Sequence, residues 1–281
     1  MIELGKFNLL KVVRKTDLGY MLTDGQDEIL MHYKQATKEL EINQEIQAYV
    51  YTDKADRKTG TMKDPALLMD KPSFVEVVNI LPGIGVFVSN HTPKDLLISK
   101  DYLPYNEAQW PALNSLLFCN LKIKKNALTA KPLNRFEIQG LKSTKRYAEQ
   151  EKVVAYVCHI ALKGIGLITK DLIYVFVPNT QLRATYRLGE EVTVTITKML
   201  DQEAYGTLNE HKELLIEDDK AIILDYLKNH NGVMPITAKS SSEDVEKIFS
   251  MSRKAFKRAY GALYKDQLID FDEKKTFLTK L

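Results

Sequence analysis

The residue types that usually carry out catalysis or bind metal ions are scattered in this chain. Histidines stand at positions 32, 91, 159, 211 and 230, and no two of them form the HExxH pair of a zinc protease. Cys119 and Cys158 have no CxxC or metal-ligand spacing, and no run matches GxGxxG or GxxxxGK followed by Ser or Thr. The sequence therefore predicts a protein that is not an enzyme and has no cofactor or metal site.

Positive charge gathers locally, although the net charge of the whole chain is only +3. Between residues 122 and 146 the only acid is Glu137, and the basic residues are Lys122, Lys124, Lys125, Lys131, Arg135, Lys142, Lys145 and Arg146. Such a segment is either a solvated linker or, beside a nucleic-acid-binding domain, a set of phosphate contacts. The sequence leaves both interpretations open.

A second basic group lies on a helix predicted over residues 253–265. At about 100° per residue, its apolar side holds Ala255, Phe256, Ala259, Tyr260 and Leu263, and the opposite side holds Lys254, Lys257, Arg258, Gly261 and Lys265. Helices are also predicted over 218–228 and from Ser242 onward, and a hairpin over 268–278. This order is typical of a winged-helix domain, whose third helix usually contacts nucleic acid. The basic side is either that contact surface or a solvated face.

Before residue 217 the pattern is that of β-strands. Short β-branched runs fall into three units, each with about five strands, and so small a sheet hides its edges best by closing into an OB-type barrel. One glycine in each unit, Gly19, Gly85 and Gly166, lies among alternating apolar residues before a polar turn and a second apolar run. We interpret the three as equivalent glycines that permit a bend or bulge in a hairpin.

The remaining composition is that of a globular protein. Apolar residues make up 44% of the chain, and no apolar run approaches the roughly 18 residues of a membrane helix. Residues 1–6 lack the pattern of a secretory signal, and two unpaired cysteines fit a reducing compartment. We expect a cytoplasmic protein.

Two stretches resemble a known family. Gly85-Val86-Phe87-Val88 followed by Asp95-Leu96-Leu97-Ile98-Ser99 resembles the core signature of the S1 RNA-binding domain, an OB-fold barrel. Three such units before a winged helix with Met251-Ser-Arg-Lys-Ala-Phe-Lys-Arg-Ala-Tyr-Gly-Ala-Leu-Tyr-Lys265 resemble the conserved virulence factor B family of bacteria. The run from Ala48 to Arg57 and the run Lys94-Asp-Leu-Leu97 are also similar to that family.

The resemblance implies an RNA-binding regulator of gene expression. An S1 domain typically places aromatic residues on its second strand, a histidine on its third, and an Asp and an Arg near the end of its fourth. The first unit keeps Asp53 and Arg57, with Met21 and Leu30 at the other positions and Tyr20 beside them. The second unit keeps Phe87, with Leu97 in place of the histidine and Asn126 in place of the arginine.

In the third unit, Phe176 falls at the histidine position, and Asp201 and Tyr205 fall at the last two. Phe87 is either a stacking platform or a core residue, because alternation does not show which face of a strand is buried. The candidate RNA-binding residues are Tyr20, Asp53, Arg57, Phe87, Lys94, Phe176, Tyr205, Lys254, Lys257, Arg258 and Lys265.

The sequence therefore predicts a mainly β fold, with three tandem S1-like OB-fold five-stranded barrels followed by an α+β winged-helix domain. The predicted domain limits are 1–64, 72–134, 150–212 and 217–281. The predicted partner is single-stranded RNA, with no membrane, and the oligomeric state is left open. The alternatives are a DNA-binding transcriptional regulator that acts through the winged helix, and a non-catalytic adaptor on the ribosome or the degradation machinery.

Overall fold

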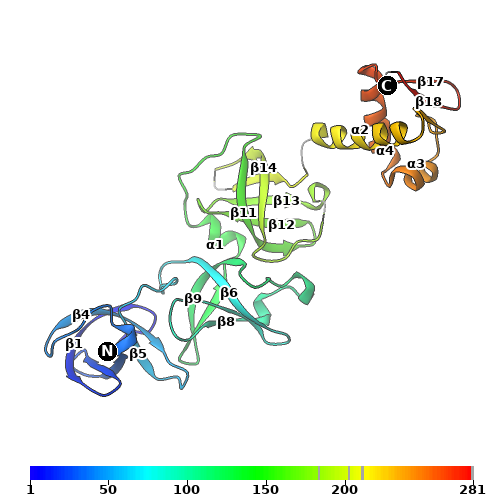
Figure 1. Ribbon diagram of the computed structural model, residues 1–281. Coiled ribbons are helices and arrows are strands. Elements are labelled where there is room, and N and C mark those ends of the chain that lie inside the picture. Colours follow the sequence, from blue (N-terminus) through cyan, green and yellow to red (C-terminus); the bar gives the residue numbers. More distant parts are fainter. Residues whose placement is uncertain (183, 202, 210–211, 280–281) are drawn as a thin grey trace. The chain divides into compact units, whose positions relative to one another are not determined.

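The computed structural model describes residues 1–182, 184–201, 203–209 and 212–279. The chain divides into two compact units, Met1–Leu208 and Asn209–Leu281, which we describe separately (Figure 1). The first unit consists mostly of strands, and the second combines helices with a small sheet. No helix in the described part of the chain is long and apolar enough to cross a membrane.

The first unit contains three closed barrels of five strands each, which confirms the predicted fold class. The first barrel comprises β1 (Phe7–Lys15), β2 (Gly19–Thr23), β3 (Glu28–His32), β4 (Glu45–Thr52) and β5 (Lys58–Thr61). The second comprises β6 (Ser73–Leu81), β7 (Gly85–Val88), β8 (Leu96–Ser99), β9 (Leu116–Lys124) and β10 (Ala127–Pro132). The third comprises β11 (Lys152–Ala161), β12 (Gly164–Thr169), β13 (Tyr174–Pro178), β14 (Glu191–Met199) and β15 (Glu203–Thr207).

Each barrel closes in the same way. The first strand pairs antiparallel with the second and the fourth, and the third strand pairs parallel with the fifth. The pairing of the first and second strands shifts once in every barrel, between Val12 and Arg14, Val77 and Asn79, and Val157 and His159. A β-bulge of this kind bends and twists its strand. The bent first strand can therefore pair with both of its neighbours in a small barrel.

The three hairpin glycines are Gly19, Gly85 and Gly164, so the prediction of Gly166 was wrong. Each opens the second strand of its barrel, and a Cβ there would lie 2.1 to 2.2 Å from a carbonyl oxygen of the third strand. Gly166 meets a side chain instead, because a Cβ would lie 2.3 Å from the Tyr174 hydroxyl. The two glycines are separated only by Ile165, and the strand register shows which of them lies at the bend.

Short helical turns connect the strands of the barrels. The 3-10 turns are η1 (Tyr33–Gln35), η2 (Lys100–Tyr102), η3 (Glu107–Gln109) and η4 (Asn179–Gln181). One α-helix, α1 (Arg135–Gln139), lies in the basic segment between the second and third barrels. Its N-cap is Asn134, which forms a capping box with Glu137, and this reciprocal pairing explains why a helix begins there.

The barrels of the first unit are packed on one another. The cores of the second and third barrels belong to one apolar cluster, and the outward-facing rings of Tyr49 and Tyr51 join it from the first barrel. Phe74 of β6 contacts both Phe118 of β9 and Tyr156 of β11, with ring centroids 4.9 and 5.1 Å away. Side chains between barrels are therefore buried as core side chains are.

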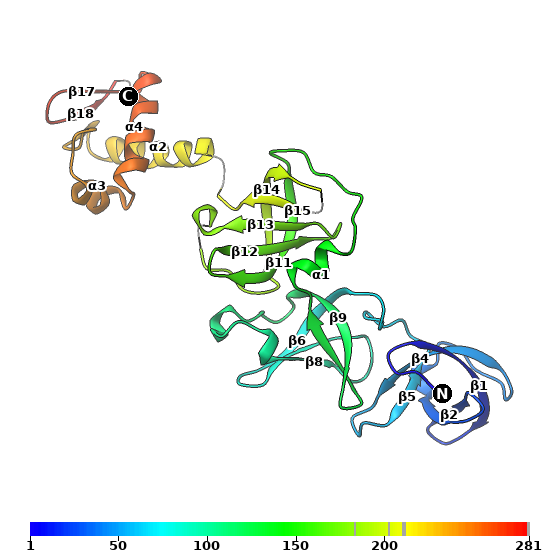
Figure 2. The same cartoon turned by 180° about the vertical axis from the view of Figure 1, so that it is seen from behind.

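The second unit has the predicted winged-helix arrangement (Figure 2). It consists of α2 (Lys212–Asn229), α3 (Ser242–Phe249), α4 (Arg253–Lys265) and a sheet of β16 (Val233–Met234), β18 (Thr276–Leu278) and β17 (Ile269–Phe271), in that order. Ser241 and Ser252 cap α3 and α4 by accepting hydrogen bonds from Asp244 N and Ala255 N.

Helix α2 begins at Lys212 rather than at the predicted residue 218. The prediction placed the helix start at Asp218, because acids favour the first turn of a helix. Acidic residues do not prevent a helix from beginning further towards the N-terminus, however, and the residues before them include good helix formers. The short strand β16 was not predicted, since two residues give no periodicity to detect.

Candidate nucleic-acid interface

Each barrel carries one row of five residues across the outside of its sheet. The row begins just after the bulge of the first strand and passes over the second, third, fifth and fourth strands. Row 1 is Arg14, Met21, Leu30, Thr59 and Tyr51. Row 2 is Asn79, Phe87, Leu97, Thr129 and Lys122. Row 3 is His159, Gly166, Phe176, Tyr205 and Lys198.

These rows lie where OB-fold barrels usually bind oligonucleotides, across the second and third strands. The rows also align the predicted site residues. Phe176 matches Leu97 and Leu30, as predicted. Tyr205, in contrast, matches Thr59, and the residue in register with Arg57 is Glu203, because Tyr205 lies opposite Phe176 on the parallel strand β15.

Row 3 combines two aromatic rings with two polar ends. Phe176 and Tyr205 contact each other edge to face, with ring centroids 6.0 Å apart. His159 and Lys198 at the two ends of the row are exposed, Phe176 is half-buried, and 37% of Tyr205 is accessible. Aromatic rings provide stacking faces for bases, and a flanking ammonium group suits a phosphate.

Row 2 offers one ring and one cation. Phe87 is half-buried between Asn79 and Leu97, so it belongs to the outer face and not to the barrel core. Lys122 at the end of the row is exposed. Leu97 and Thr129 occupy the positions where row 3 has its two rings, so row 2 has a smaller stacking surface.

Most of row 1 is inaccessible to a ligand. Tyr51 and Thr59 are buried, and Tyr51 packs into the apolar cluster of the second barrel. Arg14 is held by Glu28, with 2.9 Å between the charged atoms. The predicted contact of Tyr20 with RNA does not fit the structure, because Tyr20 is only 3% exposed and its hydroxyl accepts a hydrogen bond from Leu40 N.

Asp53 and Arg57 form a closed pair in the turn between β4 and β5. The Asp53 carboxylate accepts hydrogen bonds from Arg57 Nε at 2.9 Å and from its Nη2 at 2.8 Å. Burial opposes ionisation of Asp53, but the Arg57 amide and guanidinium and the Ala55 amide outweigh it, so the pKa of this carboxyl is lowered. The Arg57 guanidinium remains mostly exposed beside its partner.

Lys94 joins this turn from the second barrel. Its Nζ donates to the Asp56 carboxylate at 2.7 Å and to the Asp53 carbonyl at 3.0 Å. The two stretches that resemble the family, residues 48–57 and 94–97, therefore meet in space. They line a hollow of about 300 Å³, to which Pro93 also contributes. Lys94 has a structural partner before any phosphate arrives.

The predicted basic residues of the winged helix are exposed on α4. Lys254, Lys257 and Arg258 line one hollow of about 420 Å³, together with Arg253, which the sequence pattern did not single out. Lys265 is the last residue of α4, about two helical turns beyond Arg258. In the part of the chain that the structure describes, none of these five has an ion-pair partner. Like charges one helical turn apart repel each other, and a phosphate that binds between them reduces this repulsion.

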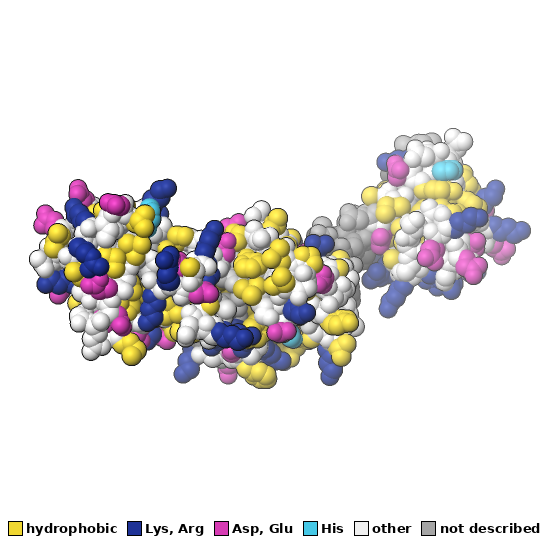
Figure 3. All heavy atoms as spheres, turned by 90° about the horizontal axis from the view of Figure 1, so that it is seen from below, with side chains coloured by type: hydrophobic (Ala, Val, Ile, Leu, Met, Phe, Trp, Pro, Cys, Tyr) yellow, Lys and Arg dark blue, Asp and Glu magenta, His cyan; other side chains and the backbone are white. Residues whose placement is uncertain are grey.

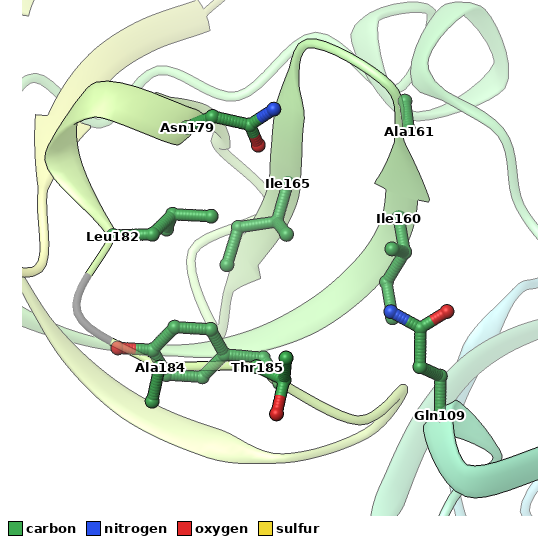
Figure 4. A pocket seen from close by; sticks show the side chains of 9 residues that line it. Gln109, Ile160, Ala161, Ile165, Asn179, Leu182, Ala184 and Thr185 are labelled. Atoms are coloured by element: carbon green, nitrogen blue, oxygen red, sulfur yellow. The ribbon is translucent and has the colours of Figure 1, made fainter.

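A hollow beside the third barrel is different in character. It measures about 500 Å³ and lies by the turn from β11 to β12, with Gln109 of η3 next to Ile160 and Leu182 across from them (Figure 4). Its lining combines apolar side chains such as Ile160 and Leu182 with the amides of Gln109 and Asn179. None of its described lining residues is charged, so it does not suit phosphates.

The charge of the molecule is otherwise mixed. Figure 3 shows Lys and Arg side chains interspersed with Asp and Glu over the visible face, without one continuous basic field. The candidate sites are therefore local groups of residues, namely row 3 and the basic side of α4. Among the described residues, no group of His, Cys, Asp and Glu side chains is arranged to hold a metal ion.

His159 and Lys198 were missed in the prediction from sequence. His159 is displaced by the bulge after Val157, and Lys198 follows a second shift between Ile196 and Lys198. Simple alternation therefore assigns both residues to the wrong face. A recurring hydrophobic-to-polar break in the first strand of each unit is the signal that would have located them.

Comparison with known proteins identifies the domains. Three family models match: an S1 domain over residues 4–63, the CvfB first S1-like domain over 73–130, and a CvfB-like winged helix domain over 221–278. S1 and winged-helix domains are folds of nucleic-acid-binding proteins.

Similar whole chains are also known. The uncharacterized protein YitL of Bacillus subtilis is 33% identical, over 92% of this chain and 87% of that protein. Conserved virulence factor B of Staphylococcus haemolyticus is 28% identical, over 86% of this chain and 82% of that protein. A crystal structure of a multidomain protein with nucleic acid binding domains from Streptococcus pneumoniae shares the fold, with a TM-score of 0.65, 22% identity and 98% coverage of both chains. The protein therefore belongs to the conserved virulence factor B family.

Proposed function

We propose that the protein binds single-stranded RNA and regulates gene expression without catalysing a reaction. The observation that carries this proposal is row 3, where the rings of Phe176 and Tyr205 adjoin between His159 and Lys198 on the outer face of a barrel. Unpaired bases stack on aromatic side chains, whereas the bases of a duplex are stacked on each other and are not available.

Row 3 provides stacking, and the winged helix provides charge. Each base that stacks on an aromatic ring contributes about 1 to 3 kcal/mol. The four basic side chains at the start of α4 lie in one hollow and bind phosphates without regard to sequence. We propose that the predicted domain limits 1–64, 72–134, 150–212 and 217–281 mark the four modules, and that the third and fourth contribute most of the binding.

The barrels do not contribute equally in this proposal. Row 1 is closed by burial of Tyr51, and row 2 has a single ring, so the first two barrels serve mainly to support the third. Arg57 and Lys94 act as secondary phosphate contacts, because both already have carboxylate partners. The cytoplasm is the proposed location.

A filter-binding comparison tests the proposal. The full chain is titrated with single-stranded RNA and with duplex DNA of equal length at one salt concentration. We expect tighter binding to the RNA, and weaker binding when Phe176 and Tyr205 are both changed to Ala. Equal or tighter binding to duplex DNA, unaffected by this double change, would instead favour a DNA-binding regulator.

A separate observation supports the second candidate function, that of a DNA-binding regulator. Helix α4 is the third helix of a winged-helix domain, the position that enters the major groove in DNA-binding relatives of this fold. Its four clustered cations suit the backbone of either nucleic acid. Binding to neither nucleic acid would contradict both candidates and leave the non-catalytic adaptor.

A further inference from the structure

Helix α1 is short but firmly held against the third barrel (Figure 2). Arg135 donates to both carboxylate oxygens of Glu203, at 2.6 and 2.9 Å, and Gln139 donates to the same carboxylate at 2.6 Å. The Arg135 guanidinium also lies 5.6 Å from the centroid of the Tyr174 ring. Ile138 is buried in an apolar cluster with Tyr174 and Ile168. A helix of five residues, too short to be stable alone, is thus fixed by tertiary contacts.

Phe136 is the exception within this helix. Its side chain is 79% exposed, although the residues on both sides of it in the sequence are tied down. A phenylalanine stabilises a fold mainly through burial of its ring, so a ring held in water by a rigid helix contributes little to folding. The structure therefore gives Phe136 no role in stability.

The position of α1 relates Phe136 to row 3. Glu203, which anchors the helix, is two residues before Tyr205 on β15, and both lie on the outer face of the barrel. Same-face neighbours on a strand are about 7 Å apart. Helix α1, which contacts Glu203 through both Arg135 and Gln139, therefore lies close to the Tyr205 part of row 3. Beyond the helix, Lys142 and Lys145 are exposed and have no ion-pair partner among the described residues.

From this arrangement we infer that α1 is a fixed wall of the nucleic-acid surface, and that Phe136 is an additional stacking platform for an unpaired base next to row 3. Glu203 is the positioning residue, because it holds the helix from which Phe136 projects. The occupant is a base of a single strand whose phosphates pass the lysines after α1. This inference rests on the proposed function and extends it to a segment outside the barrels.

Three variants test the inference on the full chain with a single-stranded RNA of mixed sequence. Phe136→Ala is expected to weaken binding about 5- to 150-fold, the loss of one stacked base, with no change in melting temperature. Tyr105→Ala is the matched control, because Tyr105 is a fully exposed ring on a loop of the second barrel, and it should leave affinity unchanged. Glu203→Gln should weaken binding less than Phe136→Ala, and the two changes together should be less than additive.

A spectroscopic readout separates stacking from indirect effects. The only tryptophan of the natural chain, Trp110, is buried, with its Nε1 bonded to the Pro104 carbonyl. In Phe136→Trp, an added exposed tryptophan should be quenched by the single strand and not by a duplex of the same sequence. If Phe136→Ala leaves the affinity for RNA unchanged while Phe176→Ala weakens it, the inference about Phe136 is wrong but the proposed function stands. Absence of RNA binding by the unmodified protein would overturn the proposed function as well. Equal losses in Phe136→Ala and Tyr105→Ala, or quenching by both nucleic acids, would also contradict a specific platform.

Discussion

The side-chain amide of Asn90 in the second barrel donates a hydrogen bond of 3.2 Å to the hydroxyl of Tyr49 in the first. The side-chain carbonyl oxygen of Asn90 accepts a hydrogen bond of 2.6 Å from Leu67 N, which lies in the connection between the two barrels. Both side chains are completely buried. One asparagine therefore satisfies polar groups from two other segments, and the first two barrels meet around it.

Asn90→Ala should lower the free energy of unfolding by about 1 to 3 kcal/mol. The change leaves the Leu67 amide and the Tyr49 hydroxyl buried with fewer partners, which costs the desolvation of each group. Urea unfolding followed by circular dichroism measures the effect. Asn79→Ala is the control, because Asn79 is exposed and should change stability by less than about 0.5 kcal/mol. Equal effects of the two changes would show that the contact is unimportant.

Stability should fall as the pH rises above 10. Burial raises the pKa of Tyr49 to about 12, despite the opposing hydrogen bond from Asn90. An unfolded tyrosine ionises near pH 10, so between pH 10 and 12 the unfolded chain has lost a proton that the folded chain keeps. This tyrosine then lowers the unfolding free energy by at most about 1.4 kcal/mol per pH unit. Urea unfolding from pH 8 to 11 should show a smaller decline for Tyr49→Phe, and an identical decline would contradict this assignment.

Gly85→Ala should destabilise the second barrel by more than about 1 kcal/mol. The new Cβ would lie 2.1 Å from the Ile98 carbonyl oxygen, at a φ of +148° that other residues rarely adopt. Gly261→Ala is the opposite case, since nothing lies near a Cβ at this exposed position of α4. That change should stabilise the second unit by roughly 0.5 to 1 kcal/mol. Thermal unfolding of both variants checks whether Gly85→Ala lowers and Gly261→Ala raises the stability.

Phe176→Ala should weaken binding of single-stranded RNA by about 1 to 3 kcal/mol with little change in melting temperature. The ring is on the outer face, so its removal creates no cavity in the barrel. Val86→Ala is the structural control, because Val86 is fully buried and its truncation should lower stability without a specific effect on binding. A loss of about 3 to 5 kcal/mol of stability in Phe176→Ala would identify the ring as core instead.

Changing Lys254 and Arg258 together to Gln should flatten the salt dependence of binding. Each phosphate that a cation neutralises adds about 0.7 to the slope of log affinity against log salt for a single strand and about 0.9 for duplex DNA, so the double change should reduce the slope by about 1.4 or 1.8. Affinities measured at several salt concentrations give the slope. Lys239 and Lys247 are exposed elsewhere in the same unit, and their joint change to Gln should leave it unaltered. A slope unaffected by Lys254 and Arg258 would mark this face as solvated surface.

Much of the fold was predictable because its signals are local. Alternation of apolar residues indicated the strands, and the apolar side of α4, with Phe256, Ala259 and Leu263, is buried as predicted. Ser252 caps this helix where its side chain type indicates a start. The prediction of Gly166 failed, in contrast, because the choice between two nearby glycines depends on a carbonyl group of another strand.

The sequence by itself determined the kind and order of the domains and the basic side of α4, since periodicity and capping act between residues close in the chain. Only the tertiary structure decided which outer face is available. Bulges move His159 and Lys198 onto the row of Phe176 and Tyr205, and barrel packing buries Tyr51 of the equivalent row. The anchoring of α1 by Glu203 joins residues far apart in the sequence. Such contacts depend on register and packing between strands, which no local pattern encodes.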